Sequence, residues 1–359
     1  MPGRPPKAQE GDSVANAPGG FPLFYERRKP RVVTADPWAF LSHLAVRLGK
    51  RNEDIANAYI AQGYDFFEAA QTPRLHSRPL LYYYAFLNVV KAALLIRQVA
   101  LPPLARHGIS DPRANSRIRL RLAGQGVQIQ NAANDRSEIF PEFLSLLGYK
   151  AALPKFFRVI DLLEVVPSIH RTFTQVMASP PIFAPIERFE IRYRRGSVWV
   201  LMRVVRADKD VRDALPRTRS RRAFTSVFSQ VESEHDDELW FETAPVRAQT
   251  RGIDNAIGQL AVLVKRCGTA AILTAQGYRF YLVNTPPSAF VPYLAAMYGV
   301  IFYLGSITRY KPDVWDKIIS GKESWIVEEF LASLPTQFLY GLASELAGVD
   351  VVRPYAAVS

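Results

Sequence analysis

Residues 78–97 read RPLLYYYAFLNVVKAALLIR, a stretch that stays apolar on nearly every side when drawn as a helix. Pro79 falls in its first turn, where the missing N–H and the fixed φ of proline fit a helix. A helix that is apolar all round must be covered by other elements. The stretch therefore predicts a central helix around which the rest of the chain packs.

Three polar residues interrupt this predicted helix on one side. Tyr84, Asn88 and Lys91 follow one another at intervals of about one turn and therefore share a face. A buried lysine needs a carboxylate, a carbonyl or a ligand phosphate, which makes the three residues candidates for a small pocket. The alternative is that Lys91 extends to solvent along its aliphatic stem while Asn88 bonds a neighbouring helix.

Two further residues belong to this candidate pocket. His107 has an imidazole that titrates near neutral pH, which suits acid–base chemistry, although bonding to the carbonyls of a helix end is its structural alternative. Arg309 ends a second apolar stretch, where its charge either stabilises the helix C-terminus or binds an anion together with Lys91. Anion binding by both residues requires the two helices to touch.

Helical signals occur on both sides of the central stretch. Asp36 and Pro37 supply a cap and a first-turn proline for a helix that runs to about Leu48. Apolar spacing predicts further helices over residues 52–70, 137–147, 156–163, 167–177, 289–310 and 324–334, with a short one starting at Pro312. Both the first and the last parts of the chain are therefore predicted to be helical.

Strand signals collect in the middle of the chain. Alternating residues and turn residues predict two hairpins over 189–205 and 270–283, a strand over 239–243, and a small separate hairpin made by 117–122 and 127–130. Residues 208–237 carry dense arginines followed by acidic residues, and this pattern predicts an exposed or mobile excursion.

Together these elements predict an α+β fold. The N- and C-terminal helices pack together around the central apolar helix, and a mostly antiparallel β-sheet region is inserted between them in sequence. The predicted boundaries are a disordered tail over 1–21, an N-terminal helical region with a small hairpin over 22–180, a β-rich region over 181–285 and a C-terminal helical region over 286–359.

Composition excludes several classes of protein. A chain of 359 residues that is 48% hydrophobic can bury a large core, which excludes global disorder. The single cysteine, Cys267, cannot form an internal disulfide, and neither a metal nor a cofactor is predicted.

Because no signal-peptide pattern opens the sequence, a cytoplasmic location is expected. The uncharged window 285–308 could span a membrane by length, but its prolines and centrally placed tyrosines favour a buried helix.

The formal net charge of +12 favours polyanionic partners. Arginines gather in clusters that predict contacts to nucleic acid or to an acidic protein, with a solvated loop as the alternative for each cluster. The predicted nucleic-acid-binding residues are Arg117, Arg119, Arg121, Arg217, Arg219, Arg221 and Arg222. His235 precedes Asp236 and Asp237, but consecutive residues cannot all face one ion, so a solvated loop is favoured over a metal site.

A series of motifs then points to a family. In order they are DFFEAA at 65–70, RPLLYYY at 78–84, NVVKA at 88–92, HGI at 107–109, GVQIQ at 126–130, IFPEF at 139–143, SITRYKPDVW at 306–315 and VEEF at 327–330. The sequence resembles the YaaC-like family of bacterial proteins over about residues 52–143 and 293–334. The resemblance implies a protein of unknown biochemical role, with no catalytic residue to carry over.

The predicted function is a non-catalytic accessory or interaction protein that binds nucleic acid or an acidic partner, within a bacterial defence or stress cassette. The alternative is a HEPN-like ribonuclease or nucleotide-processing enzyme that uses Lys91, His107 and Arg309. The arginines near His107 do not have the spacing of the HEPN motif, because Arg106 adjoins the histidine and Arg97 is too distant. The sequence leaves open whether the protein is an enzyme.

Overall fold

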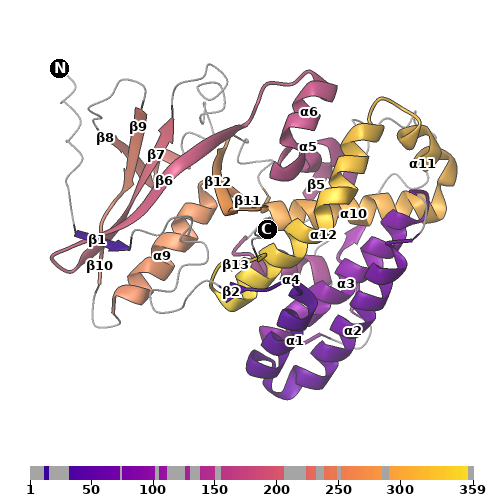
Figure 1. Cartoon of the computed structure of the whole chain (residues 1–359), viewed down its shortest axis with the longest axis horizontal. Coiled ribbons are helices and arrows are strands. Elements are labelled where there is room, and N and C mark those ends of the chain that lie inside the picture. Colours follow the sequence, from indigo (N-terminus) through magenta and orange to yellow (C-terminus); the bar gives the residue numbers. More distant parts are fainter. Residues whose placement is uncertain are drawn as a thin grey trace, which may run out of the picture. The chain divides into compact units, whose positions relative to one another are not determined.

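The computed structural model describes residues 12–15, 32–72, 75–101, 105–110, 126–129, 138–149, 155–205, 224–231, 238–248, 252–284 and 291–354. The chain forms two compact units, and each unit is assembled from separate parts of the sequence (Figure 1). We call Ala35–Ala178 with Val291–Leu346 the helical unit. We call Met1–Thr34, Ser179–Phe290 and Ala347–Ser359 the sheet unit.

The helical unit begins with two helices that the sequence predicts. Helix α1 spans Pro37–Leu48, and the Asp36 carboxylate caps it by accepting the backbone N–H groups of Trp38 and Ala39 at 2.9 and 3.1 Å. A 3₁₀ turn, Lys50–Asn52, leads into α2, which spans Glu53–Ala69. Both helices confirm the predicted boundaries to within one residue.

The central apolar stretch forms helix α3, Arg78–Ile96, and other helices enclose it. Helix α2 packs so closely that a Cβ on Gly63 would lie 3.1 Å from the Ala85 carbonyl oxygen of α3. Helix α12, Ser324–Ala347, comes from the C-terminal part of the chain, and its Phe338 ring lies 4.8 Å from that of Phe86. Helix α3 is long and apolar enough to cross a membrane, but 78% of that window is buried inside the protein. The predicted packing of N- and C-terminal helices around a central helix is confirmed.

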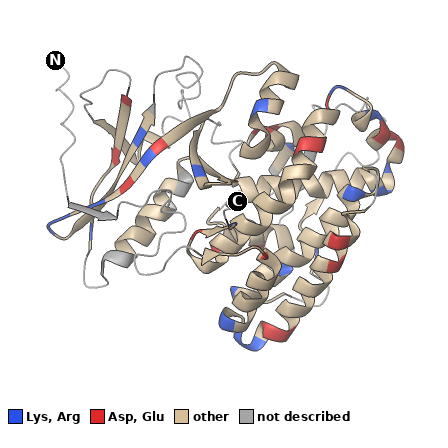
Figure 2. Ribbon diagram, viewed as in Figure 1, with Lys and Arg blue, Asp and Glu red and all other residues tan. Residues whose placement is uncertain are grey.

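Two long C-terminal helices complete this core. Helix α10 spans Tyr293–Tyr310, and its central tyrosines Tyr298 and Tyr303 are fully buried, as predicted for a buried helix. Helix α12 spans Ser324–Ala347, so the helix predicted over 324–334 continues through Pro335. Charged residues are sparse along α3 and α10, which agrees with their position in the core (Figure 2).

Shorter elements fill the rest of the helical unit. They are α4, Ile139–Leu146; α5, Val159–Glu164; the 3₁₀ turn Pro167–Ile169; α6, His170–Met177; and α11, Pro312–Ile319. Of the helix predicted over 156–163, only the second half forms, because residues up to Arg158 belong to strand β5. A short continuous apolar run does not distinguish the two structures by its period.

A small sheet accompanies these helices. Its order is β3, Ile109–Ser110; β4, Gly126–Ile129; and β5, Lys155–Arg158. The predicted strand over 127–130 is thus present, but in the described part of the chain its partners are β3 and β5. The predicted partner strand, 117–122, lies outside the described residues.

The sheet unit is built around an antiparallel sheet in the order β11-β12-β6-β7-β9-β8. The strands are β6, Phe183–Arg194; β7, Ser197–Val205; β8, Phe228–Val231; β9, Glu238–Thr243; β11, Thr269–Thr274; and β12, Gly277–Val283. Two short strands join it, β1 (Asp12–Ala15) beside β6 and β10 (Val246–Arg247) beside β7. Both predicted hairpins are confirmed.

The turn between β6 and β7 explains how the first hairpin closes. Arg195 and Gly196 both have positive φ, at 49° and 76°. Two successive positive φ values give a turn whose twist matches that of the flanking strands. Gly196 adopts this conformation without the steric cost that a Cβ would add.

Three parts of the sheet unit depart from the sequence analysis. Strand β8 lies within the predicted excursion over 208–237, and its Phe228 and Val231 are each 2% exposed, so this part of the excursion is a core element. Helix α9, Ile253–Arg266, was not predicted. The parallel pairing of β2, Val32–Val33, with β13, Val351–Val352, was not predicted either.

Replacing Gly305 with valine should test the contact between α10 and α3. A Cβ at this glycine would lie 2.9 Å from the Tyr83 Cβ, closer than real Cβ atoms approach. Because Tyr83 Cβ is anchored to the backbone, one helix must shift, and we expect Gly305→Val to cost about 1–3 kcal/mol. Urea denaturation followed by far-UV circular dichroism measures this change.

The matched control is Gly258→Ala in α9. A Cβ at Gly258 meets nothing within 4 Å, so alanine should stabilise the sheet unit by up to about 1 kcal/mol through its better helix propensity. If Gly305→Val were as well tolerated as Gly258→Ala, the close approach of α10 and α3 would be wrong.

His170 should make the protein acid-sensitive. Burial lowers its pKa to about 4, and the adjacent Arg171 adds to the effect. The unfolded chain therefore binds this proton near pH 6.5 and the folded chain near pH 4, so stability falls as the pH drops between these values. Its place at the start of α6 also disfavours the charged form. Allowing for solvent screening, we expect a loss of roughly 0.7 kcal/mol per pH unit.

Urea denaturation at pH 7 and pH 5 measures this dependence. His170→Gln should make the loss between the two pH values shallower. His76→Gln is the control, because the His76 side chain is 61% exposed. Equal slopes for the wild type and His170→Gln would contradict the prediction.

Candidate functional site

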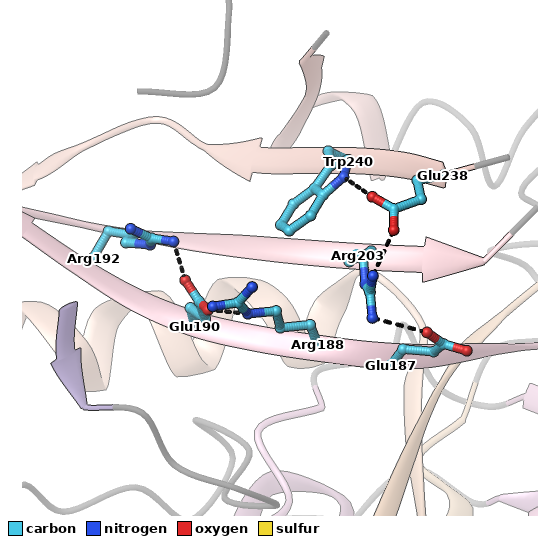
Figure 3. A network of polar contacts seen from close by, with 7 residues as sticks. All are labelled: Glu187, Arg188, Glu190, Arg192, Arg203, Glu238 and Trp240. Atoms are coloured by element: carbon cyan, nitrogen blue, oxygen red, sulfur yellow. Dashed lines mark hydrogen bonds and ion pairs between the residues drawn. The ribbon is translucent and has the colours of Figure 1, made fainter. Parts of the chain in front are cut away.

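Three arginines on the sheet are neutralised by neighbouring glutamates (Figure 3). Arg188, Glu190 and Arg192 alternate along β6 and therefore point to one side of it. The Glu190 side chain is 4% exposed, and its two carboxylate oxygens form ion pairs with Arg188 and Arg192. These arginines are held by a partner within the sheet.

Arg203 of β7 extends this network across the strands. Its guanidinium donates to Glu238 at 2.5 Å and to Glu187 at 3.0 Å, and it lies 5.9 Å from the centre of the Trp240 ring. The Trp240 indole N–H also donates to Glu238 at 2.8 Å. Because the network pairs its cations with carboxylates, it is a poor site for an anionic ligand.

The helical unit carries cations that are arranged differently. At the end of α10, the Arg309 guanidinium donates to the Tyr84 hydroxyl of α3 at 2.9 Å. The Tyr84 ring is stacked on Phe66 of α2, with centroids 5.3 Å apart. Arg309 also lies 5.0 Å from the centre of the Tyr310 ring. Two helices from the start of the chain and one from its end thus meet at Arg309.

His107 joins the same region through the neighbouring tyrosine. Tyr83 Oη lies 2.9 Å from His107 Nδ1, and the Tyr83 and Tyr84 rings are 5.4 Å apart. Burial raises the pKa of Tyr83 well above its ordinary value, so its hydroxyl remains protonated. Partial desolvation and the charge of Lys91 lower the pKa of His107. The lowered pKa favours the neutral imidazole, which shares one hydrogen bond with the Tyr83 hydroxyl.

Lys91 lies further along α3 on the same side. Its ammonium nitrogen is 4.9 Å from the centre of the Tyr59 ring of α2, a cation–π contact. Burial lowers the Lys91 pKa, and the lysine is close enough to His107 to lower the pKa of that imidazole. Among the described residues, neither Lys91 nor Arg309 has a carboxylate partner.

We call these residues the aromatic–cationic cluster. It consists of Tyr59, Phe66, Tyr83, Tyr84, Lys91, His107, Arg309 and Tyr310. Phe66, Tyr84 and Lys91 are half-buried, whereas His107, Arg309 and Tyr310 are exposed. The cluster therefore combines partly solvated cations with aromatic rings on a surface of the helical unit.

Most of the predicted pocket residues meet in this cluster. Contacts through Tyr83 connect Tyr84, His107 and Arg309, and the charge of Lys91 acts on His107. Helices α3 and α10 do touch, as anion binding requires. Asn88 is 5% exposed and lies in the interior of α3. That the five residues line one cavity stays a prediction.

Three aromatic residues of the cluster, Tyr59, Phe66 and Tyr310, were not among the residues predicted from the sequence. Tyr59 and Phe66 lie seven residues apart on α2 and so share a face, a spacing that is visible in the sequence. Their apolar character fits a face buried in the core equally well, so the sequence alone does not assign them to the aromatic–cationic cluster. Tyr310 directly follows Arg309 and could have been found from that neighbour alone.

Other sequence candidates lie elsewhere. The arginines at 117–121 and 217–222 and the residues His235, Asp236 and Asp237 fall outside the described residues. Within the part of the chain that the structure describes, no group of three His, Cys, Asp or Glu residues could hold a metal ion. Burial raises the pKa of Cys267 to about 12, so this thiol is poorly suited to act as a nucleophile.

Comparison with known proteins places the chain at the level of a family. The family model described as YaaC-like Protein matches residues 25–346, and the matched region includes the whole aromatic–cationic cluster. No curated protein and no solved structure matches significantly.

Proposed function

The chain belongs to the YaaC-like family, and we propose that it is a non-catalytic accessory protein that binds a polyanion through the aromatic–cationic cluster. The polyanion is a nucleic acid or an acidic protein partner, and the cytoplasm of a bacterial cell is the proposed location. The observation that carries the proposal is that cationic side chains have different partners in the two units. Arg188, Arg192 and Arg203 of the sheet are neutralised by glutamates, whereas Lys91 and Arg309 are held by aromatic rings.

Electrostatics supports this proposal. An arginine held by a tyrosine hydroxyl and a ring keeps its full positive charge available to an anion, and its geometry is fixed before binding. The formal net charge of +12 attracts polyanions over a longer range. The arginine clusters outside the described residues are proposed as additional contacts to the same partner.

A salt titration tests the proposal. The full chain is mixed with fluorescently labelled RNA, DNA and poly-glutamate, and binding is measured by anisotropy from low to physiological salt. We expect binding that weakens as salt increases, and Lys91→Gln with Arg309→Gln should weaken it about 10-fold at low salt and reduce the salt slope by about 2. Lys317→Gln is the control, since this exposed lysine pairs with Asp313. Absence of binding to every polyanion at low salt would overturn the proposal.

A second candidate function is an RNA- or nucleotide-processing enzyme. It is favoured by the neutral imidazole of His107, which lies close to Lys91 and is fixed by the Tyr83 hydroxyl. Such an imidazole suits general acid–base chemistry. His107→Ala distinguishes the two functions: an enzyme would lose RNA cleavage while keeping affinity, whereas an accessory protein would show no cleavage in either form. Co-purification with neighbouring gene products would test the proposed role in a defence or stress cassette.

A further inference from the structure

We propose that the polyanion is a single-stranded nucleic acid and that Tyr310 stacks on one of its bases. The inference rests on the proposed function, because it names the class of ligand for the same cluster. It comes from the geometry at the junction of α10 and α11, where the Tyr310 side chain accompanies Arg309. Tyr310 is 67% exposed, the most exposed of the large hydrophobic side chains that the structure describes.

The Tyr310 ring has one face occupied and another available. The Arg309 guanidinium lies over the ring, 5.0 Å from its centre. In the described part of the chain, no other aromatic ring packs on Tyr310. A flat ligand can therefore stack on the opposite face, and the cation beneath the ring is placed for an adjacent phosphate. Aromatic rings alternating with cations are the usual means by which proteins hold single strands.

The backbone that carries Tyr310 is fixed by its place between two helices. Tyr310 is the last residue of α10, and Pro312 begins α11 two residues later. The Lys311 N–H bonds the Ile307 carbonyl oxygen at 2.8 Å, which fixes the chain between the two helices. Arg309 is fixed in turn by the Tyr84 hydroxyl. A fixed backbone and a preorganised cation reduce the conformational entropy lost on binding.

A second aromatic pair extends the surface beyond Arg309. Phe66 and Tyr84 are stacked with an interplanar angle of 28°, and both are half-buried, so each ring is partly accessible to solvent. Lys91 and Tyr59 continue the same side of α2 and α3. Cations and rings thus alternate from Tyr310 to Tyr59, as the phosphates and bases of one strand do.

This chemistry favours a single strand over the other polyanions. A duplex stacks its bases on one another and shows their edges, so it offers no base face to an exposed ring. An acidic protein would use the cations but gains nothing from a flat ring. The exposed ring therefore distinguishes the ligand class, whereas the cations alone do not.

The test compares ligands and variants in one anisotropy assay. The full chain is titrated with a labelled pyrimidine-rich single-stranded RNA, the same RNA as a duplex, and inorganic polyphosphate as a polyanion without bases. Tyr310→Ala should weaken single-strand binding about 10-fold and leave polyphosphate binding within twofold. Tyr310→Phe should retain single-strand affinity, because the ring is preserved. Trp325→Ala is the matched control, being an aromatic side chain that is 50% exposed on α12.

The outcomes separate this inference from the proposed function. If the duplex or polyphosphate binds as tightly as the single strand, or if Tyr310→Ala leaves single-strand binding unchanged, the stacking site is wrong while polyanion binding stands. If poly-glutamate displaces the RNA and Tyr310→Ala has no effect, the partner is an acidic protein. If none of these polyanions binds at low salt, the proposed function itself fails.

Discussion

Phe338→Ala should lower the free energy of unfolding of the helical unit by about 3–5 kcal/mol, among the largest effects that we expect from a single substitution. Phe338 of α12 is fully buried, and its ring lies 4.8 Å from Phe86 of α3 and 6.1 Å from Phe143 of α4. Alanine would leave a cavity between helices that come from opposite ends of the chain. Urea denaturation followed by far-UV circular dichroism measures the loss.

A control and a double mutant make this test specific. Trp325→Ala removes a larger ring from the same helix, but its exposure predicts a change within about 0.5 kcal/mol. Phe86→Ala combined with Phe338→Ala should show a coupling energy of about 0.5–1.5 kcal/mol, because the two rings touch. Strict additivity of the two single changes would mean that α12 does not pack on α3 at this point.

Glu190→Gln should destabilise the sheet unit by about 2–4 kcal/mol. Glu190 is 3% exposed and pairs with two arginines, of which Arg192 is 13% exposed in its side chain. Without the carboxylate charge, the largely buried Arg192 would lose its ion pair with Glu190. The estimate lies below the usual cost of breaking a buried pair because Arg188 is half exposed and can be solvated.

Glu242→Gln is the control for this prediction and should have the opposite sign. Glu242 lies on the same face of the sheet, because Leu201 pairs with both Glu190 and Glu242. Burial raises the pKa of Glu242, and it has no described ion pair, so a neutral amide should be tolerated or slightly stabilising. Equal effects of Glu190→Gln and Glu242→Gln in urea denaturation would show that the ion pairs contribute little.

Elements with long, consistent patterns could be predicted from the sequence. Helix α3 could be predicted because a stretch that is apolar on nearly every side must be buried, and α1 because Asp36 and Pro37 mark its start. Helix α9 was missed although Ala256, Ile257, Leu260 and Val264 have helical spacing. It lies between strands in a region rich in β-branched residues. There the β propensity of the residues disagrees with the helical spacing of the apolar positions.

The candidate site was predictable only in part, for a physical reason. Tyr84 and Lys91 are related by the period of one helix, so their common face follows from sequence. The contact of Tyr84 with Arg309 joins residues on α3 and α10 that no local pattern connects. The strand β8 was hidden because Phe228 and Val231 stand between segments dense in charge, and their burial depends on pairing with β9.

The interleaved construction of the two units has a consequence for biosynthesis. Helix α3 is complete when the ribosome has made Ile96, but α12, which covers it, begins at Ser324. At common elongation rates, roughly 10–45 s separate the two events. During that interval the apolar surface of α3 that α12 later buries would be exposed and could aggregate. We therefore expect the nascent chain to depend on chaperones until α12 has left the exit tunnel.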